Sequence, residues 1–282
     1  MTRSTNDSPI HSLVIFTDLD GTLLDRRTFS PEPALSTLEK CRSLKIPVVL
    51  VTAKSRAEIE PIRETLRNDS PFISENGGGL YLPAHEFDFP PGFAQCGPYW
   101  CHRSTQSITE LRQALLAAAK TVNVEIKCFS RMTVEEVARL TGLNLAQAEL
   151  ARDREFDEPF IVIDENHAKL MLLKNAIADM GFRYTTGGSL HHITGDFDKG
   201  QTVELLKKLY LYSKPGTRFV GLGDAQNDLP MLRLVDFPYL VRKADGDYDR
   251  TLRLDNLTIT DGSGPAGFTE AVAGLIARFY KC

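Results

Sequence analysis

The sequence predicts an α/β protein with two parts, a Rossmann-like core built on a parallel sheet and an inserted α+β cap domain. Strand-like apolar runs alternate with helical patterns near the start of the chain and again near its end, which is typical of parallel βαβ units. Between these regions the composition shifts over residues 83–97 toward proline, glycine and aromatic residues. We therefore expect a core of residues 1–83 and 197–282 and a cap of residues 84–196.

The core elements follow from apolar runs and helical spacing. Residues 13–17 and 46–52 are short apolar runs and predict buried strands. A helix is expected over residues 55–66, although Pro61 makes its first turns uncertain. The other expected core elements are helices over residues 31–44, 199–210, 228–234 and 267–280, strands over 72–74 and 218–222, and a turn over 75–79.

The middle of the chain carries its own set of elements. They are helices over residues 106–120, 134–140, 145–152 and 167–180, a strand over 160–163, and extended segments over 182–185 and 190–194. Helices and strands mixed in this order predict an α+β lid on one face of the main sheet.

Composition excludes several classes of protein. The 282 residues are 42% hydrophobic and 25% charged, as in ordinary globular proteins. With 33 basic and 37 acidic residues there is no basic stripe for nucleic acid. No apolar run is long enough to span a membrane, and the polar start does not resemble a signal peptide. Five cysteines without CxxC spacing predict reduced thiols in a cytoplasmic protein, which we expect to be a monomer or a homodimer.

Two carboxylates follow the first strand directly. Asp18 and Asp20 are two residues apart, so both can address one ligand at the carboxyl end of the strand, where open α/β sheets bind ligands. Two like charges held this close imply a bound metal or a shared proton. The alternative is a strand that ends in an aspartate-rich turn.

The string DLDGT at residues 18–22 resembles the first signature of the haloacid dehalogenase-like phosphatase superfamily. Three further signatures of that superfamily are expected downstream. A strand ending in Thr52 matches the second, Lys199 at the start of a helix matches the third, and GDAQND at residues 223–228 matches the fourth. All four occur in the order that the superfamily has.

The resemblance implies a phosphoryl-transfer site that agrees with the chemistry of these side chains. Asp18 would attack phosphorus and form an aspartyl-phosphate, while Asp20 would act as general acid and base. Thr52 and Lys199 would hold the phosphate oxygens. Mg2+ prefers oxygen ligands, and we expect it on Asp18, the backbone carbonyl of Asp20, and Asp224. Asn227 and Asp228 would support these groups without necessarily touching the metal.

The insertion resembles the type II cap of the superfamily, whose members act mostly on small phosphorylated metabolites. The strings TAKSR (52–56), SENGGG (74–79), REFDEPF (154–160) and GGSLHH (187–192) resemble mannosyl-3-phosphoglycerate phosphatases, with Ser189 where that family is expected to have Arg. The implied substrate-binding residues are Ala53, Lys54, Glu75, Asn76, Gly77, Arg154, Gly188, Ser189 and His192.

Arg154 has two interpretations. Its planar guanidinium suits a bidentate grip on a substrate carboxylate, but it lies in a charge-rich run of the kind that usually forms a solvated loop. His191 and His192 are adjacent, so on a strand at most one of them faces the substrate.

The expected function is a Mg2+-dependent phosphomonoesterase that hydrolyses mannosyl-3-phosphoglycerate or glucosyl-3-phosphoglycerate. The partner would then be a small phosphorylated metabolite. Alternatives are a broader sugar-phosphate or sucrose-phosphate-type phosphatase, a phosphomutase, and a non-catalytic phosphometabolite-binding protein. Retention of the catalytic side chains argues against the last of these.

Overall fold

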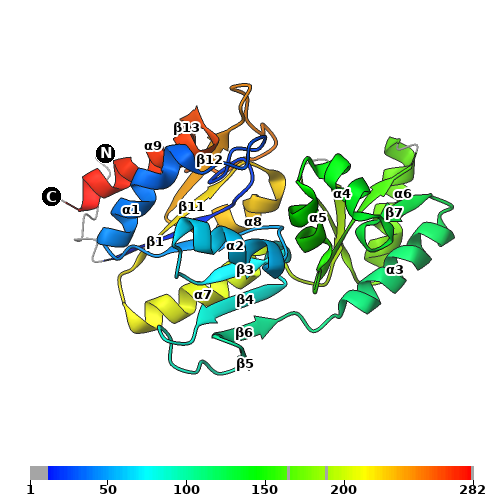
Figure 1. Cartoon of the computed structure of the whole chain (residues 1–282), viewed down its shortest axis with the longest axis horizontal. Helices are drawn as coiled ribbons and strands as arrows, with labels where there is room; N and C mark the ends of the chain where they lie inside the picture. The colour runs from blue at the N-terminus through cyan, green and yellow to red at the C-terminus, as the bar shows by residue number, and fades with distance from the viewer. Residues whose placement is uncertain (1–11, 164–165, 188–189, 281–282) are drawn as a thin grey trace.

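The computed structural model describes residues 12–163, 166–187 and 190–280, which form two lobes with one sheet each (Figure 1). The first lobe contains a nine-stranded sheet and the second a four-stranded sheet. The predicted α/β fold class is therefore confirmed, with a mostly parallel core sheet and a separate antiparallel cap sheet.

The core sheet has the strand order β13-β12-β11-β1-β2-β3-β4-β6-β5. Its strands are β1 (Leu13–Thr17), β2 (Val48–Val51), β3 (Phe72–Ser74), β4 (Gly79–Pro83), β5 (Ala94–Cys96), β6 (Tyr99–Arg103), β11 (Arg218–Gly223), β12 (Phe237–Arg242) and β13 (Thr258–Ser263). The pairs from β13 to β3 are parallel, and those from β3 to β5 are antiparallel. β1 lies inside the sheet, with Ile15 opposite Val220 on one side and Val48 on the other.

Helices cover both faces of the core sheet because its strands are apolar on both sides. Leu13 and Ile15 pack with one apolar cluster, whereas Val14 and Phe16 pack with another. The first cluster includes α1 (Leu35–Ser43), α2 (Arg56–Leu66) and α9 (Gly264–Phe279), and the second includes α7 (Lys199–Ser213) and α8 (Leu229–Leu232). Short 3-10 turns are η1 (Glu32–Ala34), η2 (Glu75–Gly77) and η4 (Gln226–Asp228).

The cap sheet has the order β7-β8-β10-β9 and is antiparallel. Its strands are β7 (Ile126–Cys128), β8 (Asp157–Val162), β9 (Arg183–Gly187) and β10 (Leu190–Thr194). One face packs on α3 (Ile108–Thr121) and α6 (His167–Asp179), and the other on η3 (Phe129–Arg131), α4 (Val134–Thr141) and α5 (Leu145–Arg152). Helices α3, α4 and α5 each begin with a capping box, a local signal that explains why the sequence predicts them closely.

The structure departs from the expected elements at several points. Residues 94–103 form the β5–β6 hairpin of the core sheet, so the chain leaves this sheet after Arg103 and not at residue 84. The prolines and glycines of residues 83–97 mark the turns around this hairpin, which explains the early boundary. β7, β12 and β13 were not expected, because they are short or contain proline or polar residues. α2 runs through Pro61, after a capping box at Ser55.

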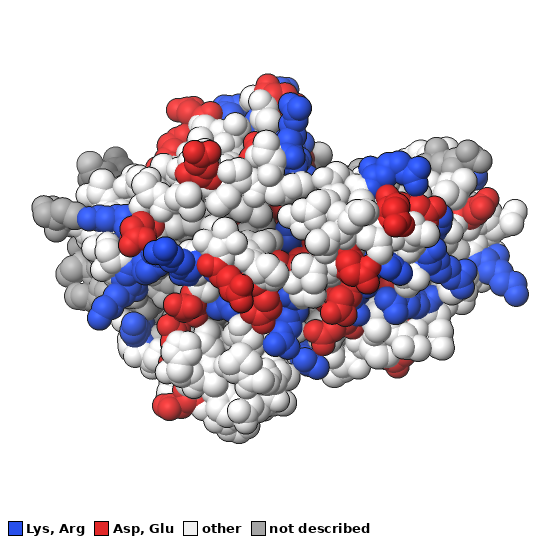
Figure 2. All heavy atoms as spheres, in the orientation of Figure 1, with Lys and Arg blue, Asp and Glu red and all other residues white. Residues whose placement is uncertain are grey.

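The surface carries both signs of charge. Basic and acidic side chains are interspersed on the face of the molecule shown in Figure 2. None of the helices in the described ranges is long and apolar enough to cross a membrane. The four described cysteines, Cys41, Cys96, Cys101 and Cys128, are free thiols.

A close backbone approach at Gly78 supports the junction of the two lobes. A Cβ at this position would lie 2.3 Å from the Cβ of Phe156, which belongs to the cap. We expect Gly78→Ala to lower the free energy of unfolding by about 1–3 kcal/mol, because the added methyl group overpacks this contact. Chemical denaturation followed by circular dichroism measures the change.

The matched control is Gly274→Ala in α9, where the added Cβ meets no heavy atom within 4 Å apart from the neighbouring residues and backbone of its own helix. This substitution should leave stability unchanged or raise it by up to about 1 kcal/mol through helix propensity. Equal stability of the two variants would contradict the packing role of Gly78.

Candidate active site

The carboxyl ends of three neighbouring strands position the site. β1 pairs with β2 on one side and β11 on the other, and the chain proceeds outward from β1 in both directions. This is the topological switch point at which open α/β sheets bind ligands. Asp18, Thr52 and Asp224 directly follow β1, β2 and β11, so the strand ends bring them to one place.

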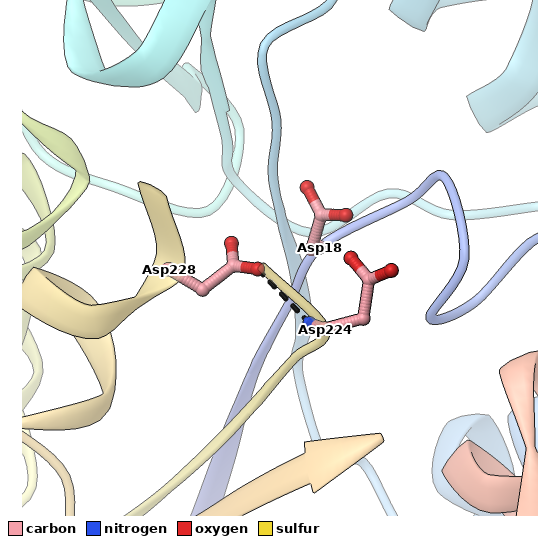
Figure 3. Close-up of side chains that lie close together, drawn as sticks. All are labelled: Asp18, Asp224 and Asp228. Carbon is pink, nitrogen blue, oxygen red and sulfur yellow. Dashed lines mark hydrogen bonds between the residues drawn. The ribbon is translucent and has the colours of Figure 1, made fainter. Parts of the chain in front are cut away.

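Three aspartates form a buried cluster at this point. One carboxylate oxygen from each of Asp18, Asp224 and Asp228 lies within 4.8 Å of the others (Figure 3). Oδ2 of Asp228 accepts hydrogen bonds from the backbone N–H groups of Asp224 (3.0 Å) and Ala225 (3.1 Å). A Cβ at Gly223 would lie 2.4 Å from the Cβ of Asp228, so glycine allows this turn to close.

Lys199 neutralises part of the cluster. Its Nζ donates to Oδ1 of Asp18 at 2.7 Å and to Oδ1 of Asp228 at 2.6 Å, and the residue is 1% exposed. Burial disfavours the ammonium, but the two carboxylates outweigh it and raise the pKa of Lys199. The side chain is thus held charged beside the expected nucleophile.

The pKa values of two of the clustered carboxyl groups, Asp18 and Asp224, are raised above their usual range. Burial above all raises the pKa of Asp18 to about 6, against the lowering effect of Lys199. Burial and the charge of Asp18 raise the pKa of Asp224 to about 6, although Arg26 opposes them. Buried acids that repel one another in this way are stabilised by a bound cation.

The donor set fits a hard divalent ion. Asp18, Asp224 and Asp228 offer only carboxylate oxygens, which is the preference of Mg2+-type ions. Oδ1 of Asp20 is buried without a hydrogen-bond partner. Nη2 of Arg26 donates to Asp224 Oδ2 (2.6 Å) and to the carbonyl of Asp20 (3.0 Å), so positive charge is already attracted to these oxygens.

Lys54 lies against the expected acid and base. Its Nζ is 2.9 Å from Oδ2 of Asp20 and 3.4 Å from Oε1 of Glu58. Glu58 is fixed in turn, because its other oxygen accepts from the N–H of Ser55 in the capping box of α2. Lys54 N–H donates to Oγ1 of Thr52 (3.2 Å), which orients the threonine hydroxyl. Lys54 also lines the cavity, so its expected contact with the substrate stays a prediction.

The site opens into a cavity of about 490 Å³ between core and cap, a size that suits a small metabolite. The core side is charged and the cap side is largely apolar. The lining residues used below are Asp18, Asp20, Thr52, Ala53, Lys54, Asp224 and Asn227 from the core, and Phe129, Leu143, Leu190, Arg154 and His192 from the cap.

Glu75 and Asn76 join the two lobes, whereas Gly77 lies against the start of α7 in the core, and none of the three lines the cavity. Oε2 of Glu75 accepts from the N–H of Phe156 at 2.7 Å, and both its oxygens are 3.1 Å from the N–H of Glu155. Asn76 donates to the carboxylate of Asp157. A Cβ at Gly77 would lie 2.4 Å from the carbonyl oxygen of Asp198. Glu75 and Asn76 thus make contacts across the boundary between core and cap, and the expected contact of all three residues with substrate stays a prediction.

Arg154 is buried, which excludes its interpretation as a solvated loop residue. Its Nε donates to the carbonyl of Ala151 (2.9 Å) and its Nη1 to the carbonyl of Ala53 (2.6 Å), with Glu58 3.9 Å from Nη2. Two of its donors are thus occupied, one within the cap and one between cap and core. A bidentate grip on a carboxylate would compete with these contacts.

The remaining expected residues divide into two groups. Gly188 and Ser189 lie outside the described residues. His192 lines the cavity, while Nδ1 of the adjacent His191 contacts the hydroxyl of Tyr184. One histidine therefore faces the cavity, as strand alternation predicts.

Sequence reasoning missed three residues of the site: Arg26, Glu58 and Asp157. The S-x-x-E spacing of Ser55 and Glu58 is a capping-box signal that would have placed Glu58 beside Lys54. No local pattern distinguishes Arg26 or Asp157, because their partners are distant in sequence.

A buried lysine among aspartates, at the switch point of a parallel sheet and beneath a cap, defines an α/β phosphoryl-transfer hydrolase. The sequence profile of the haloacid dehalogenase-like hydrolases matches residues 15–86. The chain belongs to this family, in the branch that contains the glucosyl-3-phosphoglycerate/mannosyl-3-phosphoglycerate phosphatases.

The relatives in that branch match along most of their length. A glucosyl-3-phosphoglycerate/mannosyl-3-phosphoglycerate phosphatase of Methanococcoides burtonii is 37% identical, over 94% of this chain and 97% of its own. One of the same name from Persephonella marina is 37% identical, over 92% and 96%. A mannosyl-3-phosphoglycerate phosphatase of Pyrococcus furiosus is 34% identical, over 81% and 90%.

Solved structures share the fold at low sequence identity. A haloalkanoate-superfamily phosphatase from Bacteroides thetaiotaomicron gives a TM-score of 0.66 at 17% identity, covering 99% of each chain. A subclass IIB sugar phosphatase gives 0.65 at 15% identity, covering 95% of this chain and 99% of its own. These matches confirm the fold and carry no statement about substrate.

The buried carboxyl of Glu75 predicts a pH-dependent stability. Burial above all raises its pKa from 4.5 to about 8. The folded protein therefore keeps the proton that the unfolded chain releases, so this contribution to stability is complete below about pH 4.5 and is lost as pH rises through about 8. The side chain of glutamine has no charge at any of these pH values, so the stability of Glu75→Gln should not fall in this way as the pH rises.

Thermal unfolding of both proteins across this range tests the sign. The Tm of Glu75→Gln minus the Tm of the wild type should increase from about pH 5 to about pH 8.5. Parallel Tm profiles would show that Glu75 has the same proton affinity in the folded and unfolded chains.

Proposed function

We propose that this protein is a Mg2+-dependent phosphomonoesterase that hydrolyses glucosyl-3-phosphoglycerate or mannosyl-3-phosphoglycerate to the glycosylglycerate and phosphate. The observation that carries the substrate is the 37% identity to the Methanococcoides burtonii phosphatase over nearly the whole of both chains. The aspartate–lysine cluster at the mouth of a metabolite-sized cavity supports the chemistry.

Asp18 is the nucleophile of the proposed reaction. One of its carboxylate oxygens attacks phosphorus, the bond from phosphorus to the glycerate oxygen breaks, and an aspartyl-phosphate forms. Lys199, bonded to Oδ1 of Asp18, orients this carboxylate and offsets the negative charge that accumulates around it. The hydroxyl of Thr52, in the cavity wall, donates to a phosphate oxygen.

Asp20 moves the protons. It donates a proton to the leaving glycerate oxygen and then accepts one from the water that attacks the aspartyl-phosphate. Hydrolysis releases phosphate and returns Asp18 to its starting form. Lys54, 2.9 Å from Oδ2, keeps the Asp20 side chain in place through both steps.

The family and the aspartate cluster indicate a divalent metal, and we propose Mg2+. Asp18, Asp224 and the carbonyl of Asp20 would hold it. When bound there, the ion lowers the repulsion between the carboxylates and the phosphoryl group.

The cap supplies the rest of the substrate pocket in this proposal. Phe129, Leu143 and Leu190 form an apolar wall opposite the aspartates, which excludes water from the leaving group. We assign the cap to residues 104–196 and the catalytic core to the remainder of the chain. A cytoplasmic location and a monomeric or homodimeric state stay predictions of the sequence.

Product analysis tests the proposed function. The purified protein with Mg2+ should release phosphate from glucosyl- or mannosyl-3-phosphoglycerate with a kcat/KM at least about 100-fold above that for simple sugar phosphates, because the core and cap contact different parts of the substrate. Similar rates on all substrates would indicate a broad sugar-phosphate phosphatase. Phosphoryl rearrangement without release of phosphate would indicate a mutase.

Two variants test the assigned roles of the carboxylates. Asp18→Asn should abolish turnover, because an amide is a poor nucleophile. Asp20→Asn should lower kcat by about 10²- to 10⁴-fold, the usual contribution of a positioned acid. Circular dichroism confirms that each variant is folded, and near-normal activity of folded Asp18→Asn would exclude the covalent mechanism.

Metal removal is a separate prediction. EDTA should eliminate activity without unfolding the protein, and added Mg2+ should restore activity and raise the Tm, because the ion binds the folded site alone. Asp224→Ala should remove most of the Tm increase and raise the Mg2+ concentration needed for activity. Full activity after exhaustive chelation would contradict the metal site.

A further inference from the structure

A histidine–aspartate pair lies in the cap wall of the cavity. Nδ1 of His192 is 2.7 Å from Oδ1 of Asp157, and the two side chains are 4% and 0% exposed. His192 lines the cavity together with Asp18 and Asp20. Because Nδ1 is occupied, Nε2 is the ring nitrogen left for a ligand in the cavity.

The pair continues into the core through two asparagines. Oδ2 of Asp157 accepts from Nδ2 of Asn76 (2.9 Å), and Oδ1 of Asn76 accepts from Nδ2 of Asn227 (3.1 Å). Asn227 directly precedes Asp228, the partner of Lys199. This four-residue chain of His192, Asp157, Asn76 and Asn227 therefore connects the cap wall to the loop that carries the aspartate cluster.

The backbone around Asn76 supports the chain. Asn76 has φ +59° and ψ +22°, a left-handed conformation that asparagine and aspartate adopt more readily than most residues. Its side chain is 5% exposed, and its two polar atoms are both used in the chain. Both hydrogen bonds of the chain at this position therefore require the side-chain amide of Asn76 in one orientation.

The charge of Asp157 and the apolar surroundings of His192 bear on which ligand the pair can bind. Burial alone would raise the pKa of Asp157, but His192 and Arg154 outweigh burial and lower it, so its carboxylate stays charged. A carboxylate at Nδ1 orients the ring, so that Nε2 points away from Asp157 and remains for a ligand in the cavity. The neighbouring cap residues Phe129, Leu143 and Leu190 are apolar, and two donors of Arg154 are occupied.

We propose that His192 binds the carboxylate of the substrate's leaving group and that Asp157 is the positioning residue for His192. This proposal rests on the proposed function, since it assumes a phosphate ester whose alcohol carries a carboxylate. A hydrogen bond from the Nε2–H group of the ring to a carboxylate is directional, and it is charge-assisted because the acceptor is ionised. Asn76 and Asn227 fix the position of the His192–Asp157 pair relative to the phosphate site. The phosphate and the carboxylate of one substrate can therefore be bound at the same time.

Asp157→Asn tests the positioning role. Asp157 accepts hydrogen bonds on both oxygens, and an amide can accept on only one of its two atoms, so either His192 or Asn76 loses its acceptor. We expect kcat/KM for the glycosyl-3-phosphoglycerate to fall about 10- to 100-fold, mainly through KM. Hydrolysis of p-nitrophenyl phosphate, which has no carboxylate, should change by less than about threefold.

The exchange variant N76D/D157N provides the rescue. The amide introduced at position 157 can accept from His192 and donate to the carboxylate introduced at position 76, which still accepts from Asn227. All three hydrogen bonds of the chain are restored with the groups interchanged. At least about tenfold of the lost kcat/KM should return, a recovery that a merely structural role at position 157 would not produce.

The matched control is His191→Gln. His191 adjoins His192 on β10 but contacts Tyr184, away from the Asp157 pair. Its kcat/KM on both substrates should stay within about threefold of the wild type. Thermal unfolding of every variant establishes that it is folded at the assay temperature.

The outcomes separate the two proposals. Failure of the wild type to hydrolyse a glycosyl-3-phosphoglycerate would overturn the proposed function. An active wild type combined with equal losses of D157N on both substrates, or with no rescue by N76D/D157N, would overturn the role of the His192–Asp157 pair alone. Selective loss followed by rescue supports it.

Discussion

The double ion pair of Lys199 is the interaction on which the site depends. Its ammonium bridges Asp18 at the end of β1 and Asp228 after β11, in a position with almost no access to water. Removing it would leave two buried carboxylates without a counter-charge, at a cost of about 3–5 kcal/mol. Because Lys199 is also the first residue of α7, it fixes where the chain re-enters the core after the cap.

The boundary between core and cap is held by directional polar contacts. Glu75 accepts two cap N–H groups, Arg154 donates to the carbonyl of Ala53, and Asn76 donates to Asp157. Such contacts define one orientation of the cap more sharply than an apolar surface would, since each requires a matched donor and acceptor. The same interface that closes the cavity thereby places His192 opposite the aspartate cluster.

Positive charge is distributed so that each carboxylate of the site pairs with a cation, and two of them share one. Lys199 forms ion pairs with Asp18 and Asp228. Arg26 pairs with Asp224, and Lys54 pairs with Asp20. The pairing explains how four acids can gather at one sheet edge in a protein of net charge −4, whose basic and acidic side chains are mixed on the face shown in Figure 2. A phosphate ester entering the cavity meets these cations locally.

The sequence by itself determined the α/β fold class and the family, through four short motifs in the order that the superfamily has. The roles of Asp18, Asp20, Thr52, Lys199 and Asp224 in phosphoryl transfer stay predictions. These motifs are local signals, because three of them are a short apolar strand followed directly by a polar group and one is a lysine that opens a helix. Only the tertiary structure decided that the β5–β6 hairpin extends the core sheet and that Arg154, Asn76 and Arg26 make contacts across the fold. Their partners lie 101, 81 and 198 residues away, so no periodicity or spacing could reveal which groups would meet.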